Sequence, residues 1–345
     1  MYRILIALAL AGALGACGSS GGSKSGDNPL DDGTECVRDN PLEECEVPEE
    51  EEETPPEEGI PDELAKNMAS FSISDDKSTV TVALTGLDTT PIEATYARLS
   101  ALDVMAEDGS VAYFAYSVQE DPLDRFFLAL GNTSADGSVS ALVAGDGGQF
   151  TEVQQGAGYS REGTFSPASG QVSYAGYYGA VTNLQTDEGG QLLPVPDTGG
   201  PLPDLPGQPA QVTGLIFLNA NFADATVNGE IFARVLLDPR DNSETLSLED
   251  LALQLAAIDE NGEFLGDVEM IDGAASGDPL DGGSGGSTGS YGGIFGGENA
   301  GYVAGVTSVT WSNDTYSSVE EVGVFVLTQC GMAGDYDRIC DLVQP

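Results

Sequence analysis

Between Ser70 and Thr328 the chain consists of short runs in which apolar residues alternate with small or polar ones. In the run Thr79–Leu84, the side chains of Val80, Val82 and Leu84 fall on one face of an extended segment, because successive side chains of a strand point to opposite sides. Glycine, at 46 residues, and Asp-Gly or Asn-Gly pairs separate many of these runs, which is typical of tight turns between antiparallel strands. The pattern predicts an all-β chain.

The first part of this region predicts a β-rich unit over residues 70–154. Expected strands include Gly109–Tyr116, Arg125–Leu130 and Ser138–Ala144, with turns at Asp136-Gly137 and Asp146-Gly147. The segment Tyr96–Val104 is compatible with a strand or with part of a helical turn. We expect about five or six strands in this unit.

Residues 155–330 predict about eight or nine further strands joined by short loops. They are Gly158–Phe165, Gly170–Thr182, Val212–Phe222, Ala225–Leu237, Leu251–Ile258, Glu263–Ile271, Thr288–Gly297, Tyr302–Trp311 and Val319–Thr328, with a hairpin turn at Asn261-Gly262. Strands at this spacing favour an up-and-down barrel, because closure removes the exposed edges, and they are also compatible with a sandwich.

The chain has 57 acidic and 11 basic residues and no histidine, which gives a formal net charge of −46. Such a chain repels phosphate, so nucleic acid is excluded as a partner. The lack of histidine excludes histidine-based catalytic triads, histidine zinc sites and histidine proton shuttles. Binding, structural and carboxylate-based enzymatic functions stay open.

The N-terminus has the layout of a signal peptide, residues 1–16. Arg3 precedes an apolar run that is too short to anchor the chain across a bilayer. The sequence Leu14-Gly15-Ala16-Cys17 then resembles the lipobox of bacterial lipoproteins. The resemblance implies that Cys17 is lipidated, that its amino group is acylated, for example with palmitate, and that the chain meets the membrane through this lipid anchor. By resemblance to enterobacterial lipoproteins, Gly18 in place of an acidic residue favours the outer membrane as the destination.

Residues 17–69 predict a disordered acidic tether. The stretch 43–58 holds ten glutamates, and Pro48, Pro55, Pro56 and Pro61 oppose regular structure. A stalk that lifts the folded part off the membrane is the favoured reading, and an acidic mimic of a ligand is the alternative.

After removal of the signal peptide, Cys36, Cys45, Cys330 and Cys340 remain besides Cys17. An even number of cysteines in an exported chain indicates disulfides. Three connectivities are open. We favour the local pairs Cys36–Cys45 and Cys330–Cys340, so that residues 331–345 form a disulfide-closed tail.

Three segments resemble the β-barrel domain of transferrin-binding protein B-like lipoproteins: Gly170–Asn183, Gly214–Ile231 and Gly289–Gly305. The resemblance covers about residues 155–330. It implies a small eight-stranded antiparallel barrel, preceded by a handle-like unit at 70–154, on a surface-exposed lipoprotein of the cell outer membrane. A soluble barrel is favoured over a membrane-inserted one, because the strands lack a consistent outward apolar band and aromatic girdles. It carries over no ligand-binding residue, since relatives bind different proteins through variable loops.

Four other features are candidate sites, and each also has a purely structural interpretation. The proline-rich insert Asp187–Ala210 is a partner surface or a loop, and the glycine- and serine-rich stretch Gly282–Gly293 is a connector. Asp272, Asp278 and Asp281 could hold calcium loosely, although a solvated acidic surface is the better expectation. Trp311 and Tyr316 are expected to pack at a barrel end. We predict no catalytic residue, no metal site and no cofactor.

The sequence as a whole predicts a lipid-anchored binding protein that recognises a protein or metal-carrying ligand through loops of the barrel and the handle-like unit. Because acidic residues dominate, the ligand is expected to be basic rather than acidic. Two alternatives stay open, a structural envelope lipoprotein without a soluble ligand and a carboxylate-based hydrolase.

Overall fold

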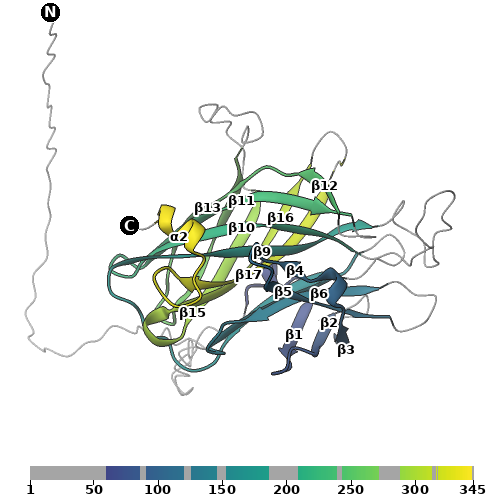
Figure 1. Cartoon of the computed structure of the whole chain (residues 1–345), viewed down its shortest axis with the longest axis horizontal. Helices are drawn as coiled ribbons and strands as arrows, with labels where there is room; N and C mark the ends of the chain where they lie inside the picture. Colours follow the sequence, from purple (N-terminus) through teal and green to yellow (C-terminus); the bar gives the residue numbers. More distant parts are fainter. Residues whose placement is uncertain are drawn as a thin grey trace, which may run out of the picture. The chain divides into compact units, whose positions relative to one another are not determined.

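The computed structural model describes residues 60–85, 91–119, 126–145, 153–185, 209–238, 243–271, 288–312, 316 and 318–343. The signal peptide, Cys17, Cys36 and Cys45 lie outside these residues. The described part is almost entirely β-structure, as the alternating pattern predicts. Its strands form two antiparallel sheets, drawn in purple to blue and in teal to yellow in Figure 1.

The first sheet is built from residues of the predicted handle-like unit. Its strands are β1 (Met68–Ile73), β2 (Thr79–Thr85), β3 (Pro91–Arg98), β4 (Val104–Met105), β5 (Val111–Val118), β6 (Phe127–Thr133), β7 (Val139–Gly145) and β8 (Gln155–Arg161). They follow the order β1-β2-β3-β5-β6-β7-β8, with β4 beside β5. The two ends of the sheet meet at one bridge, Lys66 to Gly156, so the sheet is nearly closed.

The second sheet is a closed barrel. Its strands are β9 (Gln171–Gln185), β10 (Pro209–Asn221), β11 (Thr226–Leu237), β13 (Leu251–Ala257), β14 (Glu263–Met270), β15 (Gly289–Gly296), β16 (Tyr302–Trp311) and β17 (Val319–Gln329). Each pairs antiparallel with the next along the chain, and β17 returns to pair with β9. The short strand β12 (Glu244–Ser247) pairs antiparallel with the end of β11. The eight-stranded up-and-down barrel is therefore confirmed, and the sandwich alternative is wrong.

Two sequence expectations need correction. The sequence predicts a barrel strand at Gly158–Phe165, but the strand there is β8, which pairs with β7 in the first sheet. Its Ala157 and Tyr159 are buried among the residues between the two sheets. The sequence predicts that the disordered tether includes residues 60–69, yet these residues contain helix α1 (Asp62–Ala65) and the start of β1. Leu64 is fully buried in the same layer, and this contact orders the segment.

Apolar residues form three main layers. The barrel interior holds one cluster, which includes Val212, Ile216 and Leu218 of β10. A second cluster fills the curled first sheet and includes the predicted buried face of Val80, Val82 and Leu84. The third lies between the sheets, where residues of β7 and β8 meet the outer face of β9 and β15–β17. The outer wall of the barrel is thus buried on the side that faces the first sheet.

An ion pair lies inside the barrel. The guanidinium of Arg234 donates to the Glu321 carboxylate at 2.6 Å, and both side chains are at most 1% exposed. The Tyr178 hydroxyl and the Trp311 indole N–H also donate to Glu321, each at 2.8 Å. The ring of Trp311 packs edge-on against the ring of Tyr316, with 6.3 Å between their centroids. A buried carboxylate needs such partners, so this network fixes how β9, β11, β16 and β17 meet.

Arg234→Met should destabilise the chain by about 3–5 kcal/mol, because it leaves the Glu321 charge buried without its counter-charge. The free energy of unfolding in urea measures this loss. The double variant Arg234→Met/Glu321→Gln should recover part of it, since neither charge is then buried. Equal losses in the single and double variants would contradict a role for the charge pair.

Candidate functional site

The two sheets are joined by the side chain of Tyr113, which lies on β5 and is 1% exposed. Its hydroxyl donates to the Tyr177 carbonyl oxygen of β9 at 2.6 Å. The same hydroxyl accepts from the Val326 N–H of β17 at 3.1 Å. One side chain of the first sheet therefore bonds to the backbone of two neighbouring barrel strands, and its burial raises the pKa of the phenol.

This contact sits at a gap in the pairing of β9 with β17. The paired residues run from Glu321 and Thr182 to Phe325 and Tyr178, and they resume at Thr328 and Ala175. Continuing the same register, Tyr177 and Val326 would face each other within the gap. The Tyr113 hydroxyl thus takes the place of a backbone hydrogen bond between these two residues, which keeps both polar groups satisfied.

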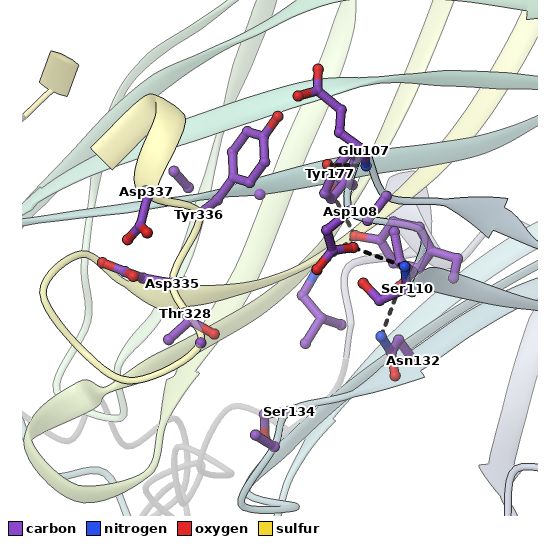
Figure 2. A pocket seen from close by; sticks show the side chains of 18 of the residues that line it. Glu107, Asp108, Ser110, Asn132, Ser134, Tyr177, Thr328, Asp335, Tyr336 and Asp337 are labelled. Carbon is purple, nitrogen blue, oxygen red and sulfur yellow. Dashed lines mark hydrogen bonds between the residues drawn. The ribbon is translucent and has the colours of Figure 1, made fainter. Parts of the chain in front are cut away.

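A cleft opens beside Tyr113, with a volume of about 660 Å³. Residues of the first sheet, of β9 and β17, and of the tail after β17 line it (Figure 2). Figure 2 shows Glu107 and Asp108 on the side of the first sheet and Asp335 and Asp337 on the side of the tail. Carboxylates from two distant parts of the sequence therefore face one space.

A tight turn between β4 and β5 positions the first pair of carboxylates. The Ala106 N–H donates to the Ser110 carbonyl at 2.8 Å, and Gly109 adopts a φ of 84° that favours glycine. Asp108 accepts from the Ser110 N–H at 2.8 Å. The Glu107 N–H donates to the Tyr177 hydroxyl at 2.8 Å, which ties the turn to the barrel.

The tail, residues 331–343, positions the second pair. The predicted disulfide between Cys330 and Cys340 is confirmed. Gly331 and Gly334 have positive φ, and this lets the chain turn back. Helix α2 (Asp337–Val343) follows, and its Ile339 and Cys340 pack on Ala175 of the barrel wall. The tail is thereby held against the rim of the cleft.

The cleft is negatively charged, and two of its carboxylates touch each other. A hydrogen bond with Asp335 and its negative charge raise the pKa of Asp337. Asp335 also accepts from the Gly331 N–H at 2.6 Å. Burial and the neighbouring Tyr177 raise the pKa of Tyr336. Among the described residues of the lining, Arg338 is the one basic side chain, and it pairs with Glu107 across the cleft.

The structure brings few of the other sequence candidates to this cleft. Trp311 and Tyr316 pack at the barrel core, and Thr288–Gly293 of the glycine-rich stretch belong mostly to β15. Asp272, Asp278, Asp281 and nearly all of the proline-rich insert lie outside the described residues. In the described ranges, no three acidic or cysteine side chains are grouped to hold a metal ion. The helices of these ranges are too short or too polar to cross a bilayer.

Sequence reasoning missed the cleft residues. The signal available was the Asp108-Gly109 pair, which marks a turn, and the acidic tail Asp335–Asp341. Neither reveals that the turn and the tail meet.

Comparison with known proteins gives structural matches alone. No protein-family model and no curated protein sequence matches the chain. Intact Ap-TbpB, with its N and C lobes, aligns with a TM-score of 0.34 and 12% identity, over 73% of this chain and 53% of that one. A transferrin-binding protein B double mutant from Haemophilus parasuis Hp5 aligns with a TM-score of 0.35 and 14% identity, over 73% and 51%. A surface lipoprotein aligns with a TM-score of 0.30 and 14% identity, over 74% and 95%.

The predicted likeness to transferrin-binding protein B is thus found among solved structures. This chain spans about half the length of the first two matches. With TM-scores of 0.30–0.35 and identities of 12–14%, the likeness transfers no ligand, partner or location to this chain.

Tyr113→Phe should lower the free energy of unfolding by about 1–3 kcal/mol, because it leaves the Val326 N–H and the Tyr177 carbonyl without their partner. Urea denaturation of the purified chain measures the change. Tyr116→Phe is the matched control on the same strand, because the buried Tyr116 hydroxyl has no hydrogen-bond partner; this variant should be neutral or slightly more stable. If both variants lose the same amount, the bridging contact does not stabilise the fold.

Proposed function

We propose that this chain is a lipid-anchored cell-envelope protein that binds a basic protein ligand in the cleft between the first sheet and the barrel. The observation that carries the proposal is the cleft itself, about 660 Å³ in volume, with Glu107, Asp108, Asp335 and Asp337 in its lining. A concave site with convergent polar groups is the usual form of a binding site. Its rim consists of a handle-side turn and the tail, which agrees with recognition through loops.

The anchor and the location belong to the same proposal. The lipobox-like Leu14-Gly15-Ala16-Cys17, followed by Gly18, supports lipidation of Cys17 and residence in the outer membrane with exposure at the cell surface. The acidic stretch after it, with ten glutamates at 43–58, would act as a spacer. Such a spacer leaves the cleft free to meet a partner away from the membrane.

Glycoside hydrolysis fits the cleft less well. The contact between Asp335 and Asp337, with a raised pKa for Asp337, is the feature that favours a carboxylate-based hydrolase. Glycoside hydrolysis, however, needs two carboxyl groups about 5–9.5 Å apart so that the sugar or a water fits between them. Two carboxyl groups that hydrogen-bond to each other leave no such room. A structural envelope protein without a ligand is the other alternative, and it gives the cleft no role.

Cys17→Ser should release the protein from membranes or stop its processing, because no acyl chains can be attached to serine through a thioether. Cell fractionation and labelling with a radioactive fatty acid measure the two effects. Cys36→Ser is the control, and this variant should stay lipidated and membrane-bound. A Cys17→Ser protein that is still processed and membrane-bound would place the anchor elsewhere.

A basic protein ligand is first recovered by pull-down with the full chain. The double variant Asp335→Asn/Asp337→Asn should then bind this ligand about tenfold more weakly, because two charged hydrogen-bond acceptors are lost. Titration calorimetry at low and moderate salt measures the affinity, which should fall as salt rises. Since the pKa of Asp337 is raised, binding should also weaken on acidification before an ordinary aspartate is protonated.

The matched control is Glu93→Gln/Asp267→Asn, which removes the same charge from exposed strand positions away from the cleft lining. An equal loss in both double variants would show attraction by overall charge, and the cleft would then not be the site.

A further inference from the structure

The cleft already contains a guanidinium group from its own chain. Arg338 of α2 reaches from the tail and donates to the carboxylate of Glu107 on the β4–β5 turn. The two side chains are 66% and 53% exposed. Exposed ion pairs of this kind contribute little to stability, so a competing group can displace Arg338 from Glu107 at low cost.

Among the described residues, the other carboxylates of the cleft have no basic partner. Asp108 accepts from a backbone N–H, and Asp335 accepts from a backbone N–H and contacts Asp337. Within the described lining, the single charge of Arg338 faces four carboxylates. Like charges that line one cleft repel each other, and an added cation relieves that repulsion.

The remaining lining suits the flat, apolar faces of a guanidinium and its stem. The rings of Tyr177 and Tyr336 lie 5.0 Å apart between centroids, at an interplanar angle of 56°. Ala112, Ala175 and Val326 add apolar surface. Aromatic faces attract guanidinium groups, and the planar fork of arginine can bond to two carboxylates at once, whereas an ammonium acts as a point charge.

We infer that the cleft is a site for an arginine side chain of a basic partner, and that Arg338 is a resident competitor that the incoming arginine displaces from Glu107. This inference rests on the proposed binding function and names the chemistry that the cleft recognises. The carboxylates lie on two sides of the cleft (Figure 2), so an incoming arginine can bridge the turn and the tail. The ligand thereby replaces a contact that the free protein makes with itself.

The test uses the purified full chain and three synthetic peptides of equal length that carry three arginines, three lysines or three citrullines. Titration calorimetry should give the strongest binding for the arginine peptide and none for the uncharged citrulline peptide. Arg338→Ala should tighten the arginine peptide about two- to fivefold, because an exposed competing pair is removed. Arg338→Lys, which keeps the charge, should fall between wild type and Arg338→Ala.

Two further variants separate this effect from general electrostatics. Lys77→Ala, in the β1–β2 turn outside the cleft lining, removes the same charge and should leave the affinity unchanged. In the Arg338→Ala background, Glu107→Gln should weaken peptide binding, because the Glu107 carboxylate is then no longer paired with Arg338 and binds the arginine of the peptide. Circular dichroism and the unfolding midpoint verify that each variant is folded.

Three results would overturn the inference. Equal tightening by Arg338→Ala and Lys77→Ala would mean that only overall charge is sensed. Equal affinity for arginine and lysine peptides would remove the guanidinium specificity. Absence of arginine-peptide binding in wild type and in Arg338→Ala would remove the arginine site. In each case the proposed binding function is tested independently, by the pull-down and by the affinity of the Asp335→Asn/Asp337→Asn variant.

Discussion

The junction of the first sheet with the barrel depends on the two hydrogen bonds that the hydroxyl of Tyr113 makes. This hydroxyl occupies a gap in the pairing of β9 with β17 and bonds to the backbone on both sides. A backbone polar group left unpaired inside a protein is costly, so the gap persists because the first sheet supplies the missing partner. The barrel wall and the first sheet are therefore completed together, and the cleft lies beside this junction.

The cleft depends on two further supports. The disulfide Cys330–Cys340 and the packing of Ile339 on Ala175 hold the tail at the rim. Inside the barrel, the Arg234–Glu321 pair with Tyr178 and Trp311 fixes the strands that carry the wall. Acidic side chains from the β4–β5 turn and from the tail are thus held over one space, and this arrangement gives the chain a local negative site beyond its overall charge.

The strands and hairpins could be predicted because their signals are local. Residues that are adjacent in the sequence determine the alternation in β2, β10 and β17 and the turn at Asn261-Gly262. The sheet to which β8 belongs could not be predicted, since the burial of Ala157 and Tyr159 depends on packing against residues far away in the sequence. The cleft was missed for the same reason. Glu107 and Arg338 are 231 residues apart, and only the closed barrel and the folded tail bring them together.

The most direct measurement of the central claim is to map where a basic ligand binds. An arginine peptide that carries a benzophenone group would be crosslinked by light to the full chain, and the modified residues would be identified by mass spectrometry. Binding in the cleft predicts crosslinks within 106–113, 132–135, 175–177 and 326–338. Crosslinks confined to the glutamate-rich stretch 43–58 or to the proline-rich insert 187–210 would contradict it, because the cleft would then not be the ligand site.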